Sequence, residues 1–561
     1  MSLPVVRVSR RAVTRGVCAS LLIAGLLLPG EAARATAADG ADFNGDGVSD
    51  MAISGSQSVL VRYGGSGATE ILRQPEGNTE TFFGASLAVG DFDNDGFDEL
   101  AIGDPFQDGH SGSMPAWAGA VWVYEGAADG LLDDATGEPH GRTKYQQGLA
   151  GIPGGAETDD LFGISVATGD LTGDGTDDLV VGSHGETLSS KSWAGAVTFV
   201  PGKTGTGLDT SKATALSQDT SGVAGAAETN DRFGYAVAIG DVTGDRKLDL
   251  VVGVTGENGR GAVQVFLGTG AASAYATSGS TAVAAGSVKI NPSAWSVIDA
   301  DYSGTDALFG SSLAVGDVTG DGIGDIVAGA PMAKVSGKHN AGAAAVLRGA
   351  AAGISSTRAQ LTGQSATNVV GASETNDQWG DSVAIGDLTG DGRAEVILGA
   401  PGEAIGTKAA AGAYTVLRTT STGVTGTGSF GVNQETANVP GGGSEARDVF
   451  GSSLAVQDLN GDGRKDVLVG SPFEDVGGVA AGAVYLLISS TTGRPSAGSA
   501  VFSGNAFSDS QGSLLYLGWS LLAGGTVPGT AVTSATSAGA SGAASTSSVK
   551  SDRAELLSTR N

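Results

Sequence analysis

The chain contains a single cysteine, Cys18, in 561 residues. This residue lies in an N-terminal segment that we expect to be removed, so the mature protein would have no disulfide and no cysteine-ligated metal. Basic residues are also scarce, with 31 Lys and Arg against 60 Asp and Glu and a formal net charge of −29. Phosphate binding requires clustered basic side chains, so this balance argues against nucleic acid and anionic lipid as partners. Excess carboxylates are compatible with bound cations, or simply with a soluble surface.

Long apolar runs are absent except for Val17–Leu28, which is too short to span a bilayer comfortably. Small residues at Ala35–Ala37 follow it, and basic residues precede it at Arg7, Arg10, Arg11 and Arg15. This order is typical of an export signal, so we predict that residues 1–37 are a signal peptide, that the protein is secreted, and that it has no membrane span. The Arg10–Arg11 pair leaves a twin-arginine route open beside the general one. An exported protein without disulfides needs another source of stability, and metal ions are the obvious candidate.

Helical periodicity is missing beyond the signal peptide, whereas glycine is plentiful at 94 residues. One unit recurs instead, for example FGISVATGDLTGDGTDDLVVG from Phe162. Further copies begin at Phe83, Phe233, Phe309, Trp379 and Phe450. Each contains a short apolar strand, an acidic turn and a second apolar strand. A third strand of the form Gly-Ala-Val follows at Gly119, Gly195, Gly261, Gly342, Gly412 and Gly482, with Ser58–Val61 as the first example.

The acidic turn occurs seven times, starting at Asp42, Asp91, Asp170, Asp241, Asp317, Asp387 and Asp458. If the variable region after each third strand adds an outer strand, each unit of about 70 residues makes one four-stranded blade. The sequence therefore predicts an all-β, seven-bladed β-propeller over residues 38–525. A row of separate small sandwiches is the alternative.

The two ends of the repeat region complement each other. The first unit begins inside its acidic turn, whereas Leu517–Gly524 matches the first strand of a unit and has no acidic turn after it. We therefore predict that the C-terminal strand completes the first blade and closes the ring, which removes exposed sheet edges. The Ser-, Ala- and Thr-rich tail at 526–561 is predicted to be disordered.

The acidic turns have the pattern of cation-binding loops. Calcium prefers six to eight oxygen ligands, and positions 1, 3, 5 and 9 offer side-chain oxygens, position 7 a backbone carbonyl, and the glycine at position 6 a sharp turn. The predicted ligands of loops one to four are Asp42, Asn44, Asp46, Val48 and Asp50; Asp91, Asp93, Asp95, Phe97 and Glu99; Asp170, Thr172, Asp174, Thr176 and Asp178; and Asp241, Thr243, Asp245, Lys247 and Asp249. Those of loops five to seven are Asp317, Thr319, Asp321, Ile323 and Asp325; Asp387, Thr389, Asp391, Arg393 and Glu395; and Asp458, Asn460, Asp462, Arg464 and Asp466.

A single loop of this kind could be no more than an Asp-Gly turn. A turn alone does not require acids at positions 1, 5 and 9 together, so seven copies in register favour calcium, with up to seven ions. Magnesium usually takes fewer protein oxygens. Loop two has four carboxylates and should bind most tightly. Loop four (241–249) has Arg246 at position 6, where a left-handed backbone costs roughly 1–2 kcal/mol, so it should be the weakest or empty.

These units resemble the FG-GAP repeats of the integrin alpha-chain N-terminal propeller and of bacterial proteins that share them. The resemblance covers residues 41 to about 525 and rests on the Phe-Gly, acidic and Gly-Ala-Val elements. It implies a seven-bladed propeller with calcium loops on one face and ligand recognition on the opposite face.

Other motifs give weaker indications. Glu-x-x-Asp precedes four of the Phe-Gly strands, at Glu157/Asp160, Glu228/Asp231, Glu374/Asp377 and Glu445/Asp448. It is either a structural turn or an acidic rim for a cationic ligand. Trp117, Trp193 and Trp295 either pack between blades or stack on a ligand. Neither a Gly-x-Ser-x-Gly nor a His-Glu-x-x-His motif occurs.

We therefore expect a secreted, monomeric adhesion-type module that binds an extracellular protein or glycan, and not an enzyme. A secreted hydrolase that uses carboxylates on the propeller face or in its channel is the alternative, and a structural surface protein without a small ligand is the third possibility.

Overall fold

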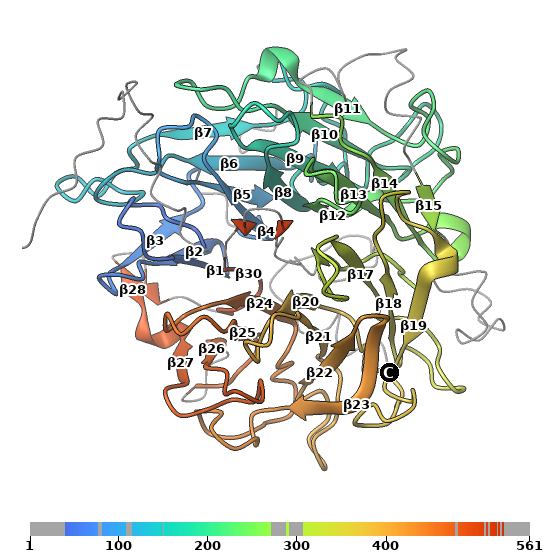
Figure 1. Cartoon of the computed structure of the whole chain (residues 1–561). Coiled ribbons are helices and arrows are strands. Elements are labelled where there is room, and N and C mark those ends of the chain that lie inside the picture. Colours follow the sequence, from blue (N-terminus) through green and yellow to red (C-terminus); the bar gives the residue numbers. More distant parts are fainter. Residues whose placement is uncertain are drawn as a thin grey trace, which may run out of the picture. The chain divides into compact units, whose positions relative to one another are not determined.

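The computed structural model describes residues 40–531, except 77–80, 108–114, 150, 271–287, 291–306, 477–480, 510–511, 514–515, 524–525 and 528–529. This part of the chain contains seven four-stranded antiparallel sheets arranged as a β-propeller (Figure 1). Its helices are 3₁₀ turns of three residues each: η1 (Thr210–Lys212), η2 (Glu257–Gly259), η4 (Ser356–Arg358) and η5 (Gly504–Ala506). The predictions of an all-β fold, seven blades and almost no helix are confirmed.

Each blade is a meander whose first strand is innermost. The strands of blades one to four, from inside outward, are β30 (Leu521–Ala523), β1 (Met51–Gly55), β2 (Ser58–Arg62) and β3 (Thr69–Arg73); β4 (Ser86–Gly90), β5 (Glu99–Asp104), β6 (Ala120–Tyr124) and β7 (Arg142–Tyr145); β8 (Ser165–Gly169), β9 (Asp178–Ser183), β10 (Ala196–Val200) and β11 (Thr214–Leu216); and β12 (Phe233–Gly240), β13 (Asp249–Val254), β14 (Ala262–Phe266) and β15 (Val288–Ile290).

Blades five to seven follow the same order. Their strands are β16 (Leu313–Gly316), β17 (Asp325–Ala330), β18 (Ala343–Leu347) and β19 (Ala359–Thr362); β20 (Val383–Gly386), β21 (Glu395–Ala400), β22 (Ala413–Thr420) and β23 (Gly423–Val432); and β24 (Ser453–Gln457), β25 (Asp466–Ser471), β26 (Ala483–Leu487) and β27 (Ala500–Ser503). Two short pairs lie outside the blades, β28 (Ser508–Asp509) with β29 (Gly512–Ser513) and β31 (Thr526–Val527) with β32 (Thr530–Ala531).

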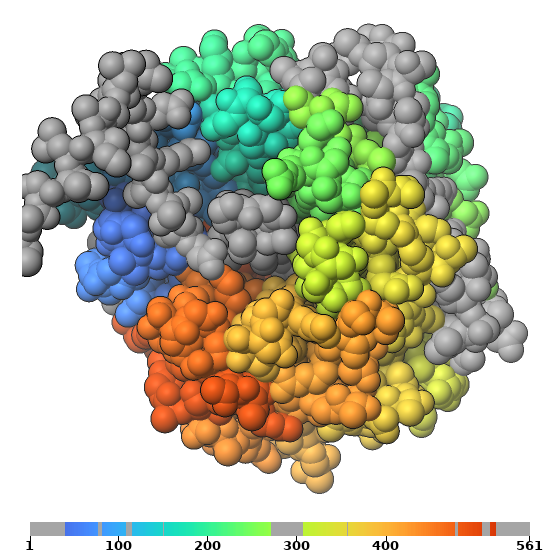
Figure 2. Space-filling view, viewed as in Figure 1, coloured from blue at the N-terminus to red at the C-terminus, as the bar shows by residue number. Residues whose placement is uncertain are grey.

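The first blade is built from both ends of the described chain. Antiparallel to β1, β30 pairs Met51 with Ala523 and Ile53 with Leu521. The inner strands neighbour one another in the order β4, β8, β12, β16, β20, β24 and β30, and β30 also lies beside β4. The blue and red-orange ends of the sequence accordingly meet in the space-filling view (Figure 2).

In six of the seven blades, the repeated serine of the first strand links the blade to the next. Ser86 Oγ donates to Gly163 O at 2.8 Å, and Ser520 Oγ donates to Gly84 O at 2.7 Å. The same bond recurs at Ser165, Ser312, Ser382 and Ser453, whereas the fourth blade has Ala236 at this position. Buried Phe, Val, Leu and Ala side chains fill the space between sheets, for example Phe233 against Phe266 with ring centroids 6.1 Å apart.

Glycine is required at the start of the third strand because the next blade approaches there. Gly119 forms a parallel bridge with Phe162, and a Cβ on Gly119 would lie 2.2 Å from Phe162 O. Its φ of +83° is also unfavourable for other residues. The Phe-Gly and Gly-Ala-Val elements therefore repeat together because they touch each other across blade boundaries.

Candidate functional site

Six of the acidic loops connect the first and second strands of blades two to seven, as predicted. Loop one directly precedes β1, because the first strand of its blade is the C-terminal β30. Each loop curls around the carboxylate at position 1. In all seven, one oxygen of that Asp accepts the backbone N–H of position 6, at 2.7–3.2 Å. The Asp at position 5 accepts the N–H of position 7 at 2.8–3.0 Å, which fixes the backbone whose carbonyl was predicted as a ligand.

Position 3 takes two conformations according to residue type. Asn44, Asp93 and Asn460 each accept the N–H of position 5, at 2.9–3.1 Å. The hydroxyls of Thr172, Thr243 and Thr389 instead lie 3.2–3.4 Å from an oxygen of the position-1 Asp. The hydroxyl of Thr319 is buried and makes no hydrogen bond.

The acid at position 9 is the most buried of the predicted ligands of each loop. Asp50, for example, is fully buried and accepts N–H groups from Phe43 and Gly64, both at 2.9 Å. Asp178, Asp249, Asp325 and Asp466 repeat this double contact, which ties the loop to the end of the third strand. Burial raises the pKa of Asp50, Asp178 and Asp249 to about 7 and that of Asp325 and Asp466 to about 6. A nearby cation would offset the cost of ionising them.

Loop two differs because it has a carboxylate at position 3, Asp93, as well as at positions 1, 5 and 9. Glu99 accepts the N–H of Phe92 at 2.7 Å, and one oxygen each of Asp91, Asp93 and Glu99 lies within 4.8 Å of the others. Among the described residues this is the one group of three acids that meets so closely. Burial, followed by repulsion from Asp93, Asp91 and Asp95, raises the pKa of Glu99 to about 9. The donor set fits a hard dication such as calcium.

Loop four has the backbone strain that its sequence predicts. Arg246 has a φ of +67°, and its N–H donates to Asp241 at 2.7 Å. The ammonium of Lys247 lies 3.7 Å from Asp245, another predicted ligand. A strained backbone and two neighbouring cations both oppose a bound metal ion here.

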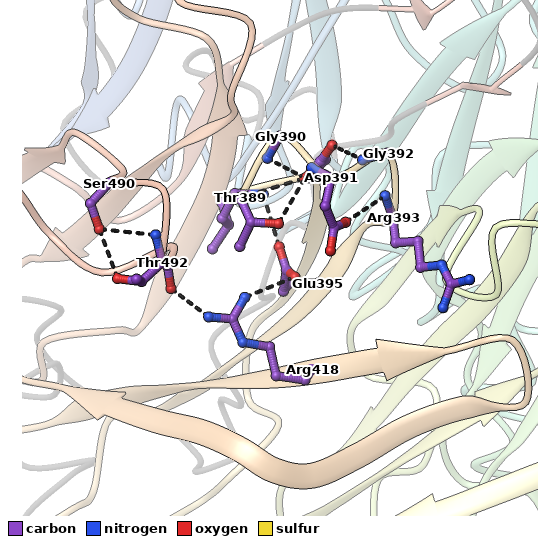
Figure 3. A network of polar contacts seen from close by, with 11 residues as sticks. Thr389, Gly390, Asp391, Gly392, Arg393, Glu395, Arg418, Ser490 and Thr492 are labelled. Atoms are coloured by element: carbon purple, nitrogen blue, oxygen red, sulfur yellow. Dashed lines mark hydrogen bonds and ion pairs between the residues drawn. The ribbon is translucent and has the colours of Figure 1, made fainter.

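Basic side chains also reach loops six and seven, which the sequence analysis missed. Arg418, on the long strand β22, lies 3.0 Å from the buried Glu395 and also donates to Thr492 O (Figure 3). Burial still raises the pKa of Glu395 above its usual value, with Arg418 acting in the opposite direction. In loop seven, Arg464 pairs with Asp462. These pairs would compete with a metal ion for the same carboxylates.

Neighbouring loops are joined through position 8. Asp98 N donates to Asp42 O at 3.1 Å and Asp98 Oδ2 accepts from Asp42 N at 2.7 Å. Asp177 makes the same pair of contacts with Asp91, at 3.1 and 3.2 Å. Burial raises the pKa of Asp98 to about 7. The sequence analysis assigned no role to position 8, because its hydrogen-bond partner lies in a different blade.

The opposite end of the strands carries the other motifs. In each Glu-x-x-Asp turn the Asp accepts the N–H of the Glu, at 2.5–2.6 Å, as in a structural turn, one of the two roles that the sequence left open. Trp117 is 39% exposed and packs edge-on to Phe106. Trp193 packs edge-on to His184, whose pKa is lowered to about 3 by burial. Trp295 lies outside the described residues.

Two sequence-family models match the repeat region. The model of the FG-GAP repeat matches residues 83–124, 162–200, 233–266, 309–347, 379–417 and 450–487, and that of the FG-GAP-like repeat matches 29–102. No helix in the described part of the chain has the length and apolar character needed to span a membrane.

Several curated integrin alpha chains are similar to part of this chain. Integrin alpha-5 of Xenopus laevis is 37% identical over 105 residues, 18% of this chain and 8% of the relative. Integrin alpha-PS5 of Drosophila melanogaster is 33% identical over 159 residues, 26% of this chain and 14% of the relative. The matches thus span less than a fifth of these relatives.

Among solved structures, a rhamnogalacturonan lyase from Bacillus licheniformis aligns with 74% of this chain and 77% of its own length, at 15% sequence identity. The TM-score of 0.28 is too low to support an argument about function.

Proposed function

The chain is an FG-GAP repeat β-propeller similar in sequence to integrin alpha chains, and on this basis we propose that it is an exported calcium-binding module that holds an extracellular protein or glycan. The observation that carries the calcium proposal is the convergence of Asp91, Asp93 and Glu99 in loop two. The buried closing acids of the other loops support it, because ionising them at neutral pH requires a counter-charge.

The ions would act mainly on stability. A ligand that binds the folded state alone stabilises it by RT ln(1 + [L]/Kd), or about 2.7 kcal/mol per site at a hundredfold excess over Kd. We expect chelation to lower the melting temperature strongly and calcium to restore it, with matched sodium chloride as the control. An unchanged melting temperature after complete removal of calcium would contradict this role.

Site-directed changes separate loop two from the others. Glu99→Gln removes one charge from the converging acids and should remove about one tight calcium ion per chain by isothermal titration. Asp245→Asn, in the loop already opposed by Lys247 and Arg246, serves as the control and should leave the tight sites unchanged.

A row of aromatic rings favours ligand binding on the face opposite the loops. Trp117 contacts Phe106 at 5.6 Å between centroids, Phe106 stacks on Phe82 at 6.2 Å, and Phe82 meets Trp519 edge-on at 5.2 Å. Phe473 continues the row, 5.7 Å from Trp519. Trp117 is 39% exposed at its end. Aromatic rings of this kind provide contact area for sugars and protein side chains.

The ligand proposal is tested with a glycan array and with capture of proteins from the protein's natural surroundings, both in calcium. Trp117→Ala should weaken the binding found by either method without changing the melting temperature. Val370→Ser alters another exposed apolar residue, 42% exposed, and is the control. Binding that survives Trp117→Ala undiminished would place the ligand elsewhere.

Export is tested on the protein recovered from the growth medium. If residues 1–37 are a signal peptide, its N-terminal sequence begins at Ala38. A secreted protein that retains Val17–Leu28 would refute the assignment.

A further inference from the structure

Four blades carry a second acidic cluster at the end of the strands opposite the loops. Each contains an Asp two residues before the Phe or Trp of the repeat, a Glu three residues after the second strand, and a Gln from the preceding blade. We call these the acid–amide clusters. They are Asp160, Glu186 and Gln147 in blade three; Asp231, Glu257 and Gln218 in blade four; Asp377, Glu403 and Gln364 in blade six; and Asp448, Glu474 and Gln434 in blade seven.

The backbone brings the three side chains together. In blade three, Gly185 N, immediately before Glu186, donates to Asp160 O at 3.2 Å. Gln147 reaches across the blade boundary, and its Nε2 donates to Glu186 Oε2 at 2.5 Å. Blade six repeats both contacts, with Gly402 N to Asp377 O at 3.1 Å and Gln364 Nε2 to Glu403 Oε2 at 2.7 Å.

The clusters have more acceptors than donors. Gln147 is 4% exposed, and its Oε1 makes no hydrogen bond; Asp160 is fully buried, and its Oδ1 makes none either. Rotating the amide of Gln147 would turn its oxygen toward the Glu186 carboxylate, so this contact fixes the orientation of the unpaired oxygen. The Oε1 atoms of Gln218, Gln364 and Gln434 are also buried without a partner. An unpaired buried acceptor is destabilising, so the recurrence of an unpaired amide oxygen in four blades points to a missing donor or cation beside it.

In blades two and five, neither position of the pair is an acid. Blade two has Thr81 and Gln107 at the Asp and Glu positions, and blade five has Ala307 and Ala333. In blade two, Gln74 Nε2 donates to Gln107 Oε1 at 2.7 Å, Gln107 Nε2 donates to Glu76 Oε2 at 2.7 Å, and Asp104 accepts the N–H of Phe82. The blade therefore forms without the acid pair. Where the pair is present, its two acids form a unit together with the glutamine.

We propose that the acid–amide clusters of blades three, six and seven each bind a hard divalent cation of the calcium type. The ligands are one oxygen from the Asp, one from the Glu and the unpaired Oε1 of the Gln, and water completes the shell. Carboxylate and amide oxygens are the donors that such ions prefer. The site is separate from the acidic loop of the same blade, because a strand of five or six residues, roughly 17–20 Å, lies between them.

Blade four binds least well of the four. There, the side-chain amide of Asn258 donates to Glu257 Oε1 at 2.6 Å. This hydrogen bond occupies a carboxylate oxygen that a cation would otherwise contact.

The first test uses crystals of the secreted protein grown in calcium chloride, with anomalous data collected at long wavelength. The expected result is an anomalous peak bounded by Asp160, Glu186 and Gln147, with equivalent peaks in blades six and seven and none beside Thr81 or Ala333. A water molecule without anomalous signal, or a direct carboxyl–carboxylate contact that shares a proton, would overturn the proposal. Peaks in the acidic loops are scored separately, so the two kinds of site succeed or fail independently.

The second test counts bound calcium by equilibrium dialysis and elemental analysis. Asp160→Asn/Glu186→Gln should lose about one ion per chain, and Thr81→Asp/Gln107→Glu should gain about one. Glu99→Gln, in an acidic loop, is the control for the other class of site. If the first variant does not fold, the count for the second decides, and an unchanged count there refutes the proposal.

Discussion

Arg418, on strand β22, pairs with Glu395 of loop six, one of the carboxylates that we propose as calcium ligands. Its Nη1 lies 3.0 Å from Glu395 Oε1, the Glu395 side chain is 3% exposed and that of Arg418 is 24% exposed. Arg418→Met keeps the aliphatic stem beside the ring of Phe430, over which the guanidinium lies at 5.5 Å, and removes only the charge and its hydrogen bonds.

The size of the effect depends on whether calcium is present. Removing one partner of a buried ion pair costs roughly 3–5 kcal/mol, and solvent around Arg418 reduces this to about 2–3 kcal/mol. In calcium, the ion takes the place of the guanidinium, and binding at a hundredfold excess over Kd returns about 2.7 kcal/mol. We therefore expect the variant to be destabilised with chelator and close to wild type with calcium.

The assay is urea unfolding at neutral pH, with chelator and with calcium. Arg494→Met is the matched control, because Arg494 lies 4.3 Å over the same Phe430 ring. Its loss of stability should be the same in both conditions. If Arg418→Met also loses the same amount of stability with and without calcium, Glu395 does not face an ion in loop six. The ligand assignment there is then wrong.

Three further predictions test other residues. Arg246→Gly removes the cost of a φ of +67°, so it should raise stability by roughly 1 kcal/mol and tighten calcium binding in loop four, as checked by melts and titration calorimetry. Asp104 is buried, with its pKa raised to about 7 against about 3.9 when unfolded. The folded protein binds the extra proton between these values, so stability falls as pH rises through this window and levels off above it; melts of Asp104→Asn should show a shallower fall, and an identical pH profile would refute the shift. Gly119→Ala should cost more than 2 kcal/mol, since its Cβ would lie 2.2 Å from Phe162 O. The control Gly205→Ala, with φ +70° and nothing within 4 Å, should cost only the roughly 1–2 kcal/mol of backbone strain in the same unfolding assay.

The repeat predicted most of the fold because its signature residues have local or fixed partners. The acidic loop sets the connection between the first two strands. The glycine before each third strand bridges the first residue of the next unit, as Gly119 bridges Phe162. The unmatched segment at 517–524 could be related to the incomplete first unit because both are parts of one pattern. β30 within that segment pairs with β1.

The sequence predicted less about the loops because their surroundings come from other strands and blades. Arg418 reaches Glu395 because it follows Leu417, which pairs with Val396, so the two side chains meet across neighbouring strands. Asp98 bonds to Asp42 across a blade boundary, and no spacing within loop two indicates that contact. The loop sequences therefore distinguish loops two and four, but they do not indicate the charges that other strands bring to loops six and seven.

The pairing of β30 with β1 also orders events during synthesis. The ribosome releases β1 more than 460 residues before Leu521, so this strand waits with one edge unpaired until nearly the whole propeller has been made. A chain interrupted after any of the first six blades would retain that open edge and could recruit a foreign strand to it. If the protein is exported as we propose, the cell gains from moving it unfolded, or from keeping β1 covered, until the last blade has emerged.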